Sequence, residues 1–214
     1  AQRDKLPLRP GDARLTREQL LRLSVFQALS PRAQAQLGGP QTQGAVVLRR
    51  YAPGELICRQ GDAGFTAFFL LTREDLRALG EPDAAADAQV EVLLRAAAPA
   101  ASAKGAGSAA PGGLAGLLRR LRRPAPGAAD AGDDLGAPVA TLGEGEVFGE
   151  MSCMHRAPRA ATVRAVGACV VLEFLGNILE ILLSSERFRE ALDAAYRERA
   201  LGGLLRQLPL FAGL

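Results

Sequence analysis

A series of short strand-like segments, separated by glycine- and proline-containing turns, most constrains how this chain folds. Each segment is apolar or alternates between apolar and polar residues. The segments are 45–51, 56–59, 67–71, 89–94, 139–142, 145–148, 161–166 and 168–174. Pro53-Gly54 and Gly61-Asp62 separate the first three. Segments of this length and punctuation predict about eight short antiparallel strands.

Helices are predicted before the strands. Thr16 and Gln19 match a capping box, so we expect a helix to begin directly after Thr16. Ser30 as the N-cap and Pro31 at the first helical position predict another helix. Residues 1–44 are therefore predicted to be an N-terminal helical segment.

Helices are also predicted within and after the strands. Thr72 with Asp75 predicts a short capped helix through Leu79. After the last strand, apolar residues recur at helical spacing with a break at Ser184-Ser185, which predicts two helices over 175–201. Strands flanked by helices place the chain in the α+β class, mainly β.

Residues 96–138 have the composition of an insertion. They are dominated by alanine, glycine and proline and are too poor in large side chains to bury a core. We expect a disordered surface loop between two strands. Within it, residues 114–123 combine leucines on one helical face with four arginines. This stretch is either a basic amphipathic element for a partner or an anionic membrane, or a transient helix in a solvated loop.

Composition narrows the function classes. A chain of 214 residues holds one domain with additions or two small ones. A formal charge of +3 indicates no strong electrostatic attraction to nucleic acid. The three cysteines lack the paired spacing of a zinc site, so we expect no metal and a cytoplasmic location. No apolar run is long enough to span a bilayer. His155, the only histidine, has no acid or base near it in sequence, so we expect no enzyme.

Residues 148–163 contain the groups that are suited to binding a ligand. Gly149 frees the backbone to approach a ligand, Glu150 can accept from hydroxyls, and Arg159 can form a fork-like pair with an anion. Residues 152–155 are predicted to form one helical turn with amides directed at the same anion. An arginine buried here without its anion would be an uncompensated charge, which argues for binding. Cys153, inside this turn, is either a thiol with a lowered pKa or a small packing residue.

The order and spacing of this motif resemble the phosphate-binding cassette of cyclic nucleotide-binding domains, as found in protein kinase A regulatory subunits and the catabolite activator protein. Phe148-Gly149-Glu150 and Pro158-Arg159-Ala160-Ala161-Thr162-Val163 match the family pattern, and residues 51–62 resemble its first hairpin. The resemblance implies a jelly-roll β-barrel over residues 45–174, carrying the insertion, with N-terminal helices and a C-terminal helical lid.

The resemblance also implies residue roles. Glu150 would bind the ribose 2′-hydroxyl and Arg159 the cyclic phosphate, with backbone amides near Gly149, Ser152 and Ala160 completing the cradle. A hydroxyl of Ser152 could add to the phosphate contacts. The predicted ligand-binding residues are Gly149, Glu150, Met151, Ser152, Arg159, Ala160, Ala161 and Tyr196.

Two of these residues bear on selectivity and signalling. Ala160 follows the cassette arginine, where a hydroxyl residue favours cGMP in the family, so we expect cAMP to be favoured and cGMP to be the weaker ligand. Tyr196 is a candidate to stack on the base, and the alternative is one more apolar contact between helix and barrel.

The predicted function is a cyclic nucleotide-binding regulatory module that signals through its C-terminal helices. The alternative is a degenerate fold that serves as a ligand-independent interaction or dimerisation scaffold. Residues 208–214 echo 23–29, so 202–214 are predicted to be a linker and the start of a second, tandem copy. The expected partners are the nucleotide and that downstream domain. A transcription factor is disfavoured because no helix-turn-helix follows Tyr196 in this sequence.

Overall fold

The computed structural model of the chain describes residues 5–81, 88–95 and 134–207, and side chains in the last range as far as Arg197. The basic stretch at 114–123, most of the predicted insertion and the terminal echo at 208–214 lie outside the described residues.

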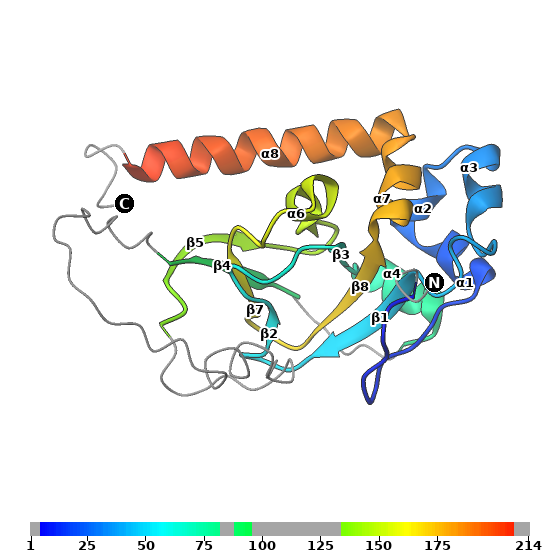
Figure 1. The fold of residues 1–214 in the computed structure, drawn as a ribbon, viewed down its shortest axis with the longest axis horizontal. Coiled ribbons are helices and arrows are strands. Elements are labelled where there is room, and N and C mark those ends of the chain that lie inside the picture. Colours follow the sequence, from blue (N-terminus) through cyan, green and yellow to red (C-terminus); the bar gives the residue numbers. More distant parts are fainter. Residues whose placement is uncertain (1–4, 82–87, 96–133, 208–214) are drawn as a thin grey trace, which may run out of the picture.

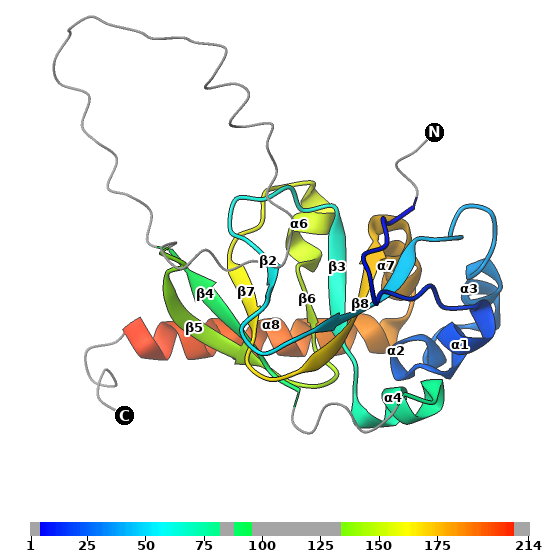
Figure 2. The ribbon, with the colours of Figure 1, turned by 90° about the horizontal axis from the view of Figure 1, so that it is seen from below.

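The strands form two four-stranded sheets in which every pairing is antiparallel (Figures 1 and 2). The first has the order β1-β8-β3-β6, with bounds β1 Val46–Tyr51, β8 Cys169–Leu175, β3 Thr66–Leu70 and β6 Val147–Phe148. The second has the order β2-β7-β4-β5, with bounds β2 Leu56–Cys58, β7 Thr162–Ala165, β4 Val90–Leu94 and β5 Ala137–Leu142. This double-sheet arrangement with flanking helices confirms the predicted antiparallel jelly-roll class.

The central strand β8 accounts for much of the core. It pairs with β1 on one side and β3 on the other, so both of its edges are hydrogen-bonded. Val171, Leu172 and Phe174 are fully buried. The almost wholly apolar sequence predicted this placement, because a strand buried on both faces needs no alternation.

The N-terminal helices are α1 Arg17–Arg22, α2 Ser24–Gln27 and α3 Pro31–Gln36. Helices α1 and α3 begin where their caps predicted, whereas α2 has no side-chain cap and was not predicted. The Thr16–Gln19 capping box is present at α1, and the Ser30 hydroxyl accepts from the Ala33 amide at α3. Between β3 and β4, helix α4 (Arg73–Leu79) starts with the predicted Thr72–Asp75 capping box.

Asp75 also ties α4 to the N-terminal helices. Its carboxylate is buried and accepts from both the amide (2.6 Å) and the hydroxyl (3.0 Å) of Ser24, the first residue of α2. One side chain therefore caps α4 and fixes α2 beside it.

Two helices follow the sheets, α7 (Gly176–Leu183) and α8 (Glu186–Gln207). In Figure 1, α8 runs along the top of the molecule, above the short helix α6 (Glu150–His155), and it contacts β5. Phe188 and Leu192 are buried and Tyr196 is half-buried, which makes an apolar stripe at four-residue spacing. At the start of α8, the Ser185 hydroxyl donates to the Ala28 carbonyl, which anchors this end on the N-terminal helices.

Most strand bounds lie within one or two residues of the predicted ones, and two differences have a clear physical reason. β5 begins at Ala137, inside the predicted insertion, and includes Pro138; a proline fits there because β5 is the edge strand of its sheet and Pro needs no ladder donor. α8 continues past the predicted boundary at 201 to Gln207, because the Leu-Leu-Arg-Gln sequence after Gly202-Gly203 favours helix. Within the described ranges, none of the helices is both long and apolar enough to cross a membrane.

Candidate functional site

The cassette backbone turns sharply at Gly149. Strand β6 ends at Phe148, and Gly149 has a left-handed φ of 75° as the N-cap of α6. A Cβ at this position would lie 2.6 Å from Arg159 Nη1 and 3.1 Å from Phe68. Both the conformation and the packing therefore require glycine. The predicted helical turn at 152–155 is the second half of α6.

Gly64, in the loop before β3, is a second position where the cassette leaves no room for a side chain. A Cβ there would come within 2.4 Å of Ser152 Cβ and 2.7 Å of the Ala157 carbonyl oxygen. The loop after β2 thus presses directly against α6. No sequence argument had placed Gly64 at the site, although a glycine three residues after Gly61 was a visible signal.

Arg159 is buried, with 6% of its surface exposed, and its guanidinium is held by oxygen atoms of the protein. Nη1 donates to the Thr66 carbonyl (2.6 Å) and the Gly149 carbonyl (2.9 Å), and Nη2 donates to the Thr66 hydroxyl (2.7 Å). The guanidinium carbon lies 4.9 Å from the centre of the Phe68 ring, which stacks on Phe148. Cation–π contact adds to these hydrogen bonds.

This environment corrects the argument that Arg159 would be uncompensated without an anion. In the described residues no carboxylate pairs with it directly, yet neutral acceptors satisfy both Nη atoms. The bonds use both N–H groups of Nη1 and one of Nη2. The Nε–H and the second Nη2–H remain, and in a guanidinium these lie side by side, parallel to one another. That edge has the geometry to bind two oxygens of one anion.

Glu150 is the first residue of α6 and is also buried, with 3% of its surface exposed. Its Oε1 accepts a hydrogen bond from the Tyr196 hydroxyl. Its Oε2 is buried and has no hydrogen-bond partner within the described part of the chain. Buried carboxylate oxygens are normally hydrogen-bonded, so Oε2 is an acceptor that calls for a donor from elsewhere.

Tyr196 therefore contributes a contact that neither sequence interpretation foresaw. Its ring packs partly against the core, but its hydroxyl donates to Glu150. This bond joins α8 to the first residue of α6. No pattern in the sequence indicates this bond, because the rotation of α8 about its axis depends on packing.

The remaining predicted residues lie around this centre. Ser152 is buried, and its hydroxyl donates to the Pro158 carbonyl (3.2 Å). Met151 is 47% exposed, Ala160 is exposed and Ala161 is half-buried. The structure thus brings Gly149 to Arg159 by one hydrogen bond and Glu150 to Tyr196 by another. Thr66 and Phe68 also belong to the site and were missed.

Cys153 behaves as a packing residue. It is buried, its thiol contacts the Phe65 carbonyl oxygen at 3.4 Å, and burial raises its pKa despite the nearby Arg159. A raised pKa leaves little thiolate at neutral pH, so a reactive thiol is not formed here. The described residues contain no group of three or more histidine, cysteine, aspartate or glutamate side chains that could hold a metal ion.

Comparison with solved structures finds several chains to which this one is similar. They include the regulatory domain of Toxoplasma gondii protein kinase A with cAMP (16% identity, TM-score 0.45, 85% of this chain and 48% of that one). The regulatory subunit of a cAMP-independent protein kinase A from Trypanosoma brucei matches with 16% identity and a TM-score of 0.45, over 91% of this chain and 47% of that one. A cAMP-binding acyltransferase from Mycobacterium smegmatis matches with 17% identity and a TM-score of 0.48, over 85% and 40%.

The chain spans less than half the length of each of these three solved chains. The curated protein sequences gave no significant match. At the level of sequence families, residues 129–186 match the model described as cyclic nucleotide-binding domain. The matched range contains the whole cassette, and it confirms the resemblance to cyclic nucleotide-binding domains that the sequence motif indicated.

Proposed function

We propose that this chain is a regulatory module in which Glu150 binds the ribose 2′-hydroxyl of a cyclic nucleotide and Arg159 binds its phosphate. The observation that carries the proposal is the buried Oε2 of Glu150, which has no donor within the described residues. Leaving a buried acceptor unsatisfied costs about 1–3 kcal/mol, and more when it is charged. A ligand hydroxyl would satisfy this oxygen while Oε1 keeps its bond to Tyr196.

Arg159 supports the second half of the proposal. Its Nε and Nη2 edge offers parallel donors, the arrangement that binds phosphate through two oxygens. Gly149 lies between the two groups, since its carbonyl accepts from Arg159 and Glu150 follows it in the chain. An anion and a hydroxyl on one small ligand match this pair of sites.

We propose cAMP as the favoured nucleotide. In the family that the cassette resembles, a hydroxyl residue after the cassette arginine favours cGMP. Here that position is Ala160, which is exposed and has no hydroxyl to offer the guanine amino group. The contrast between the two nucleotides is expected to be modest, because one hydrogen bond contributes about 0.5–1.5 kcal/mol.

The proposed signal passes through α8. Tyr196 bonds the same carboxylate that would receive the ribose, so binding changes the surroundings of the contact that holds α8 against α6. A ligand shifts the position of α8 only by its differential affinity for the docked and undocked states. The effector that reads this movement, expected to be a downstream domain, is part of the same proposal.

A ligand-independent scaffold is the second candidate, and one observation favours it. Thr66 and Gly149 hold both Nη atoms of Arg159 without any anion, so the protein alone fixes the shape of the cassette. The two candidates differ in a single measurable property, the affinity of the folded protein for nucleotide.

Calorimetric titration with cAMP and with cGMP tests the proposal. The wild-type protein is expected to bind cAMP with a Kd of about 1 μM or lower. Arg159→Ala should weaken binding by about 2–5 kcal/mol, and Glu150→Gln by about 1.5–3 kcal/mol. Arg32→Ala is the matched control, because it removes the same charge from the exposed surface of α3. Folded protein that gives no heat with either nucleotide favours the scaffold and refutes the sensor.

A further inference from the structure

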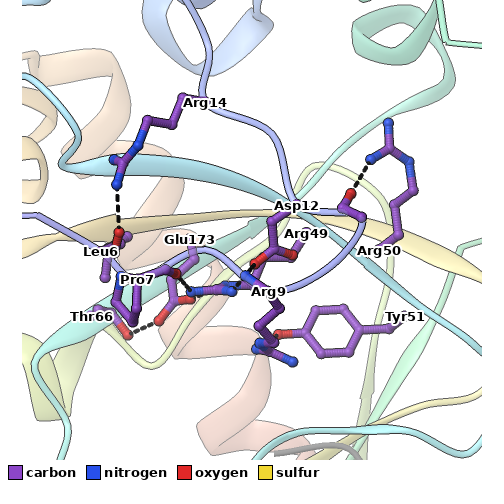
Figure 3. Close-up of polar contacts among 11 residues, drawn as sticks. Leu6, Pro7, Arg9, Asp12, Arg14, Arg49, Arg50, Tyr51, Thr66 and Glu173 are labelled. Carbon is purple, nitrogen blue, oxygen red and sulfur yellow. Dashed lines mark hydrogen bonds and ion pairs between the residues drawn. The ribbon is translucent and has the colours of Figure 1, made fainter.

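Thr66 connects Arg159 to a buried cluster of charged residues. Figure 3 shows Thr66 and this cluster. The Thr66 hydroxyl accepts from Arg159 Nη2 at 2.7 Å and donates to Glu173 Oε1 at 2.8 Å. A threonine hydroxyl has one proton, and arginine can only donate. The direction of these hydrogen bonds is therefore fixed: the Thr66 hydroxyl donates to Glu173, and a lone pair of the same hydroxyl oxygen accepts from Arg159.

The cluster holds Glu173 in place from its other side. Glu173 Oε2 accepts from Arg49 Nε, and Arg49 Nη1 donates to Asp12 Oδ2. Arg49 Nη2 donates to the Pro7 carbonyl at 3.0 Å. The side chains of Arg49, Asp12 and Glu173 are 4%, 5% and 12% exposed, so water competes little with these bonds.

The register of the first sheet makes this arrangement possible. Glu173 on β8 lies directly opposite Val47 on β1 and Phe68 on β3. Arg49 and Thr66 are each two residues from those partners, so their side chains share the face of Glu173. The polar side chains thus cross three neighbouring strands and end at Asp12 on the N-terminal segment, as Figure 3 shows.

Charge reinforces the geometry. Arg49 is shared by two carboxylates, Asp12 and Glu173. Glu173 in turn faces Arg159 across the Thr66 hydroxyl. This attraction keeps Nη1 and Nη2 turned toward Thr66, which leaves the Nε and Nη2 edge for an anion.

We propose that Thr66 and Glu173 are positioning residues that orient Arg159 for a phosphate ligand, with the Asp12–Arg49 pair fixing Glu173. The proposal rests on the proposed function for the identity of the ligand, but the orientation of Arg159 is a property of the free protein. Thr66→Val removes the hydroxyl at nearly constant volume, and Thr66→Ser restores it. Glu173→Gln removes the charge but leaves an acceptor.

The first measurement needs no ligand. NMR of the guanidinium N–H groups follows Arg159, whose signals are assigned by their loss in Arg159→Lys. In Thr66→Val these signals are expected to broaden, or their N–H protons to exchange faster with water. In Thr66→Ser they are expected to stay as in the wild type. Unchanged signals in a folded Thr66→Val protein overturn the proposal, whether or not the protein binds nucleotide.

The second measurement is calorimetric titration with cAMP in a double-mutant cycle. Thr66→Val and Glu173→Gln should each weaken binding about three- to tenfold in the wild-type background. In the Arg159→Lys background they should change affinity by less than about twofold, because they act through the guanidinium. An equal loss in both backgrounds overturns the proposal. A third outcome separates the two proposals. If Thr66→Val changes the Arg159 signals but the wild-type protein binds no cAMP, the proposed function is refuted and the positioning role of Thr66 remains.

Discussion

Removing the Tyr196 hydroxyl is expected to loosen α8 before it disturbs the rest of the fold. In Tyr196→Phe, Glu150 loses its donor at Oε1 while its Oε2 already lacks one. A buried acceptor left unsatisfied costs about 1–3 kcal/mol. The protein escapes this cost if α8 lifts and water reaches the carboxylate. The expected result is an increase of about 5- to 150-fold in the opening of α8.

The increase should be confined to one part of the helix. Phe188 and Leu192 remain buried in the variant and hold the first turns of α8. Hydrogen–deuterium exchange measured by mass spectrometry should therefore rise most in the peptides beyond Leu192. Saturating cAMP, if the protein binds it, should alter this exchange in the wild type more than in the variant.

Tyr51→Phe is the matched control. Tyr51 is the other tyrosine of the chain; it is buried on β1, and its hydroxyl accepts from Arg9 at 3.0 Å. Its removal costs a buried hydrogen bond without touching α8. Equal hydrogen exchange of α8 in Tyr196→Phe and wild-type protein would refute the role of the Tyr196–Glu150 hydrogen bond in holding α8. An equal rise in Tyr196→Phe and Tyr51→Phe would refute it too.

Further predictions concern stability and thiol reactivity. Asp75→Ala should lower the free energy of unfolding in urea by about 2–3 kcal/mol, because the Thr72 amide and Ser24 both lose their buried acceptor, although Thr72 still caps α4. The exposed neighbour change Glu74→Ala should stay within about 0.5 kcal/mol. Burial raises the pKa of Cys58 to about 11 and of Cys169 to about 12, from an ordinary 9.0. The native thiols should therefore resist iodoacetamide at neutral pH and react only after unfolding. Because the unfolded thiols ionise first, stability should fall as pH rises above about 9; rapid native labelling, or stability that rises in this range, would contradict the assignment.

Local features of the fold were predictable from sequence because their causes are local. The capping boxes at Thr16 and Thr72 depend on residues three positions apart, and both are present. The turn at Gly149 depends on the absence of a Cβ, and its φ is positive. The short spacing between Gly149 and Arg159 also let the motif bring these two together.

The partners of Arg159 and Glu150 were not predictable, because they depend on register and helix rotation. Thr66 lies 93 residues before Arg159 in the chain, and Glu173 lies 107 residues after Thr66. Alternation assigns a residue to a face of a strand, but it does not say which residue of the next strand lies opposite. Tyr196 meets Glu150 only because Phe188 and Leu192 fix which side of α8 faces the cassette.

The contacts of Arg159 and Glu150 make Glu150, rather than Arg159, the stronger evidence for a ligand. Glu173 faces Arg159 across Thr66, and three hydrogen bonds hold the guanidinium, so a buried Arg159 is stabilised by the protein without any anion. A phosphate would then bind through the free Nε and Nη2 edge rather than by neutralising a lone cation. Glu150 has no such explanation, since nothing in the described residues donates to its buried Oε2. A buried Arg159 is therefore compatible with either a sensor or a scaffold, whereas the unpaired Oε2 of Glu150 favours the sensor, because a ligand hydroxyl would satisfy it.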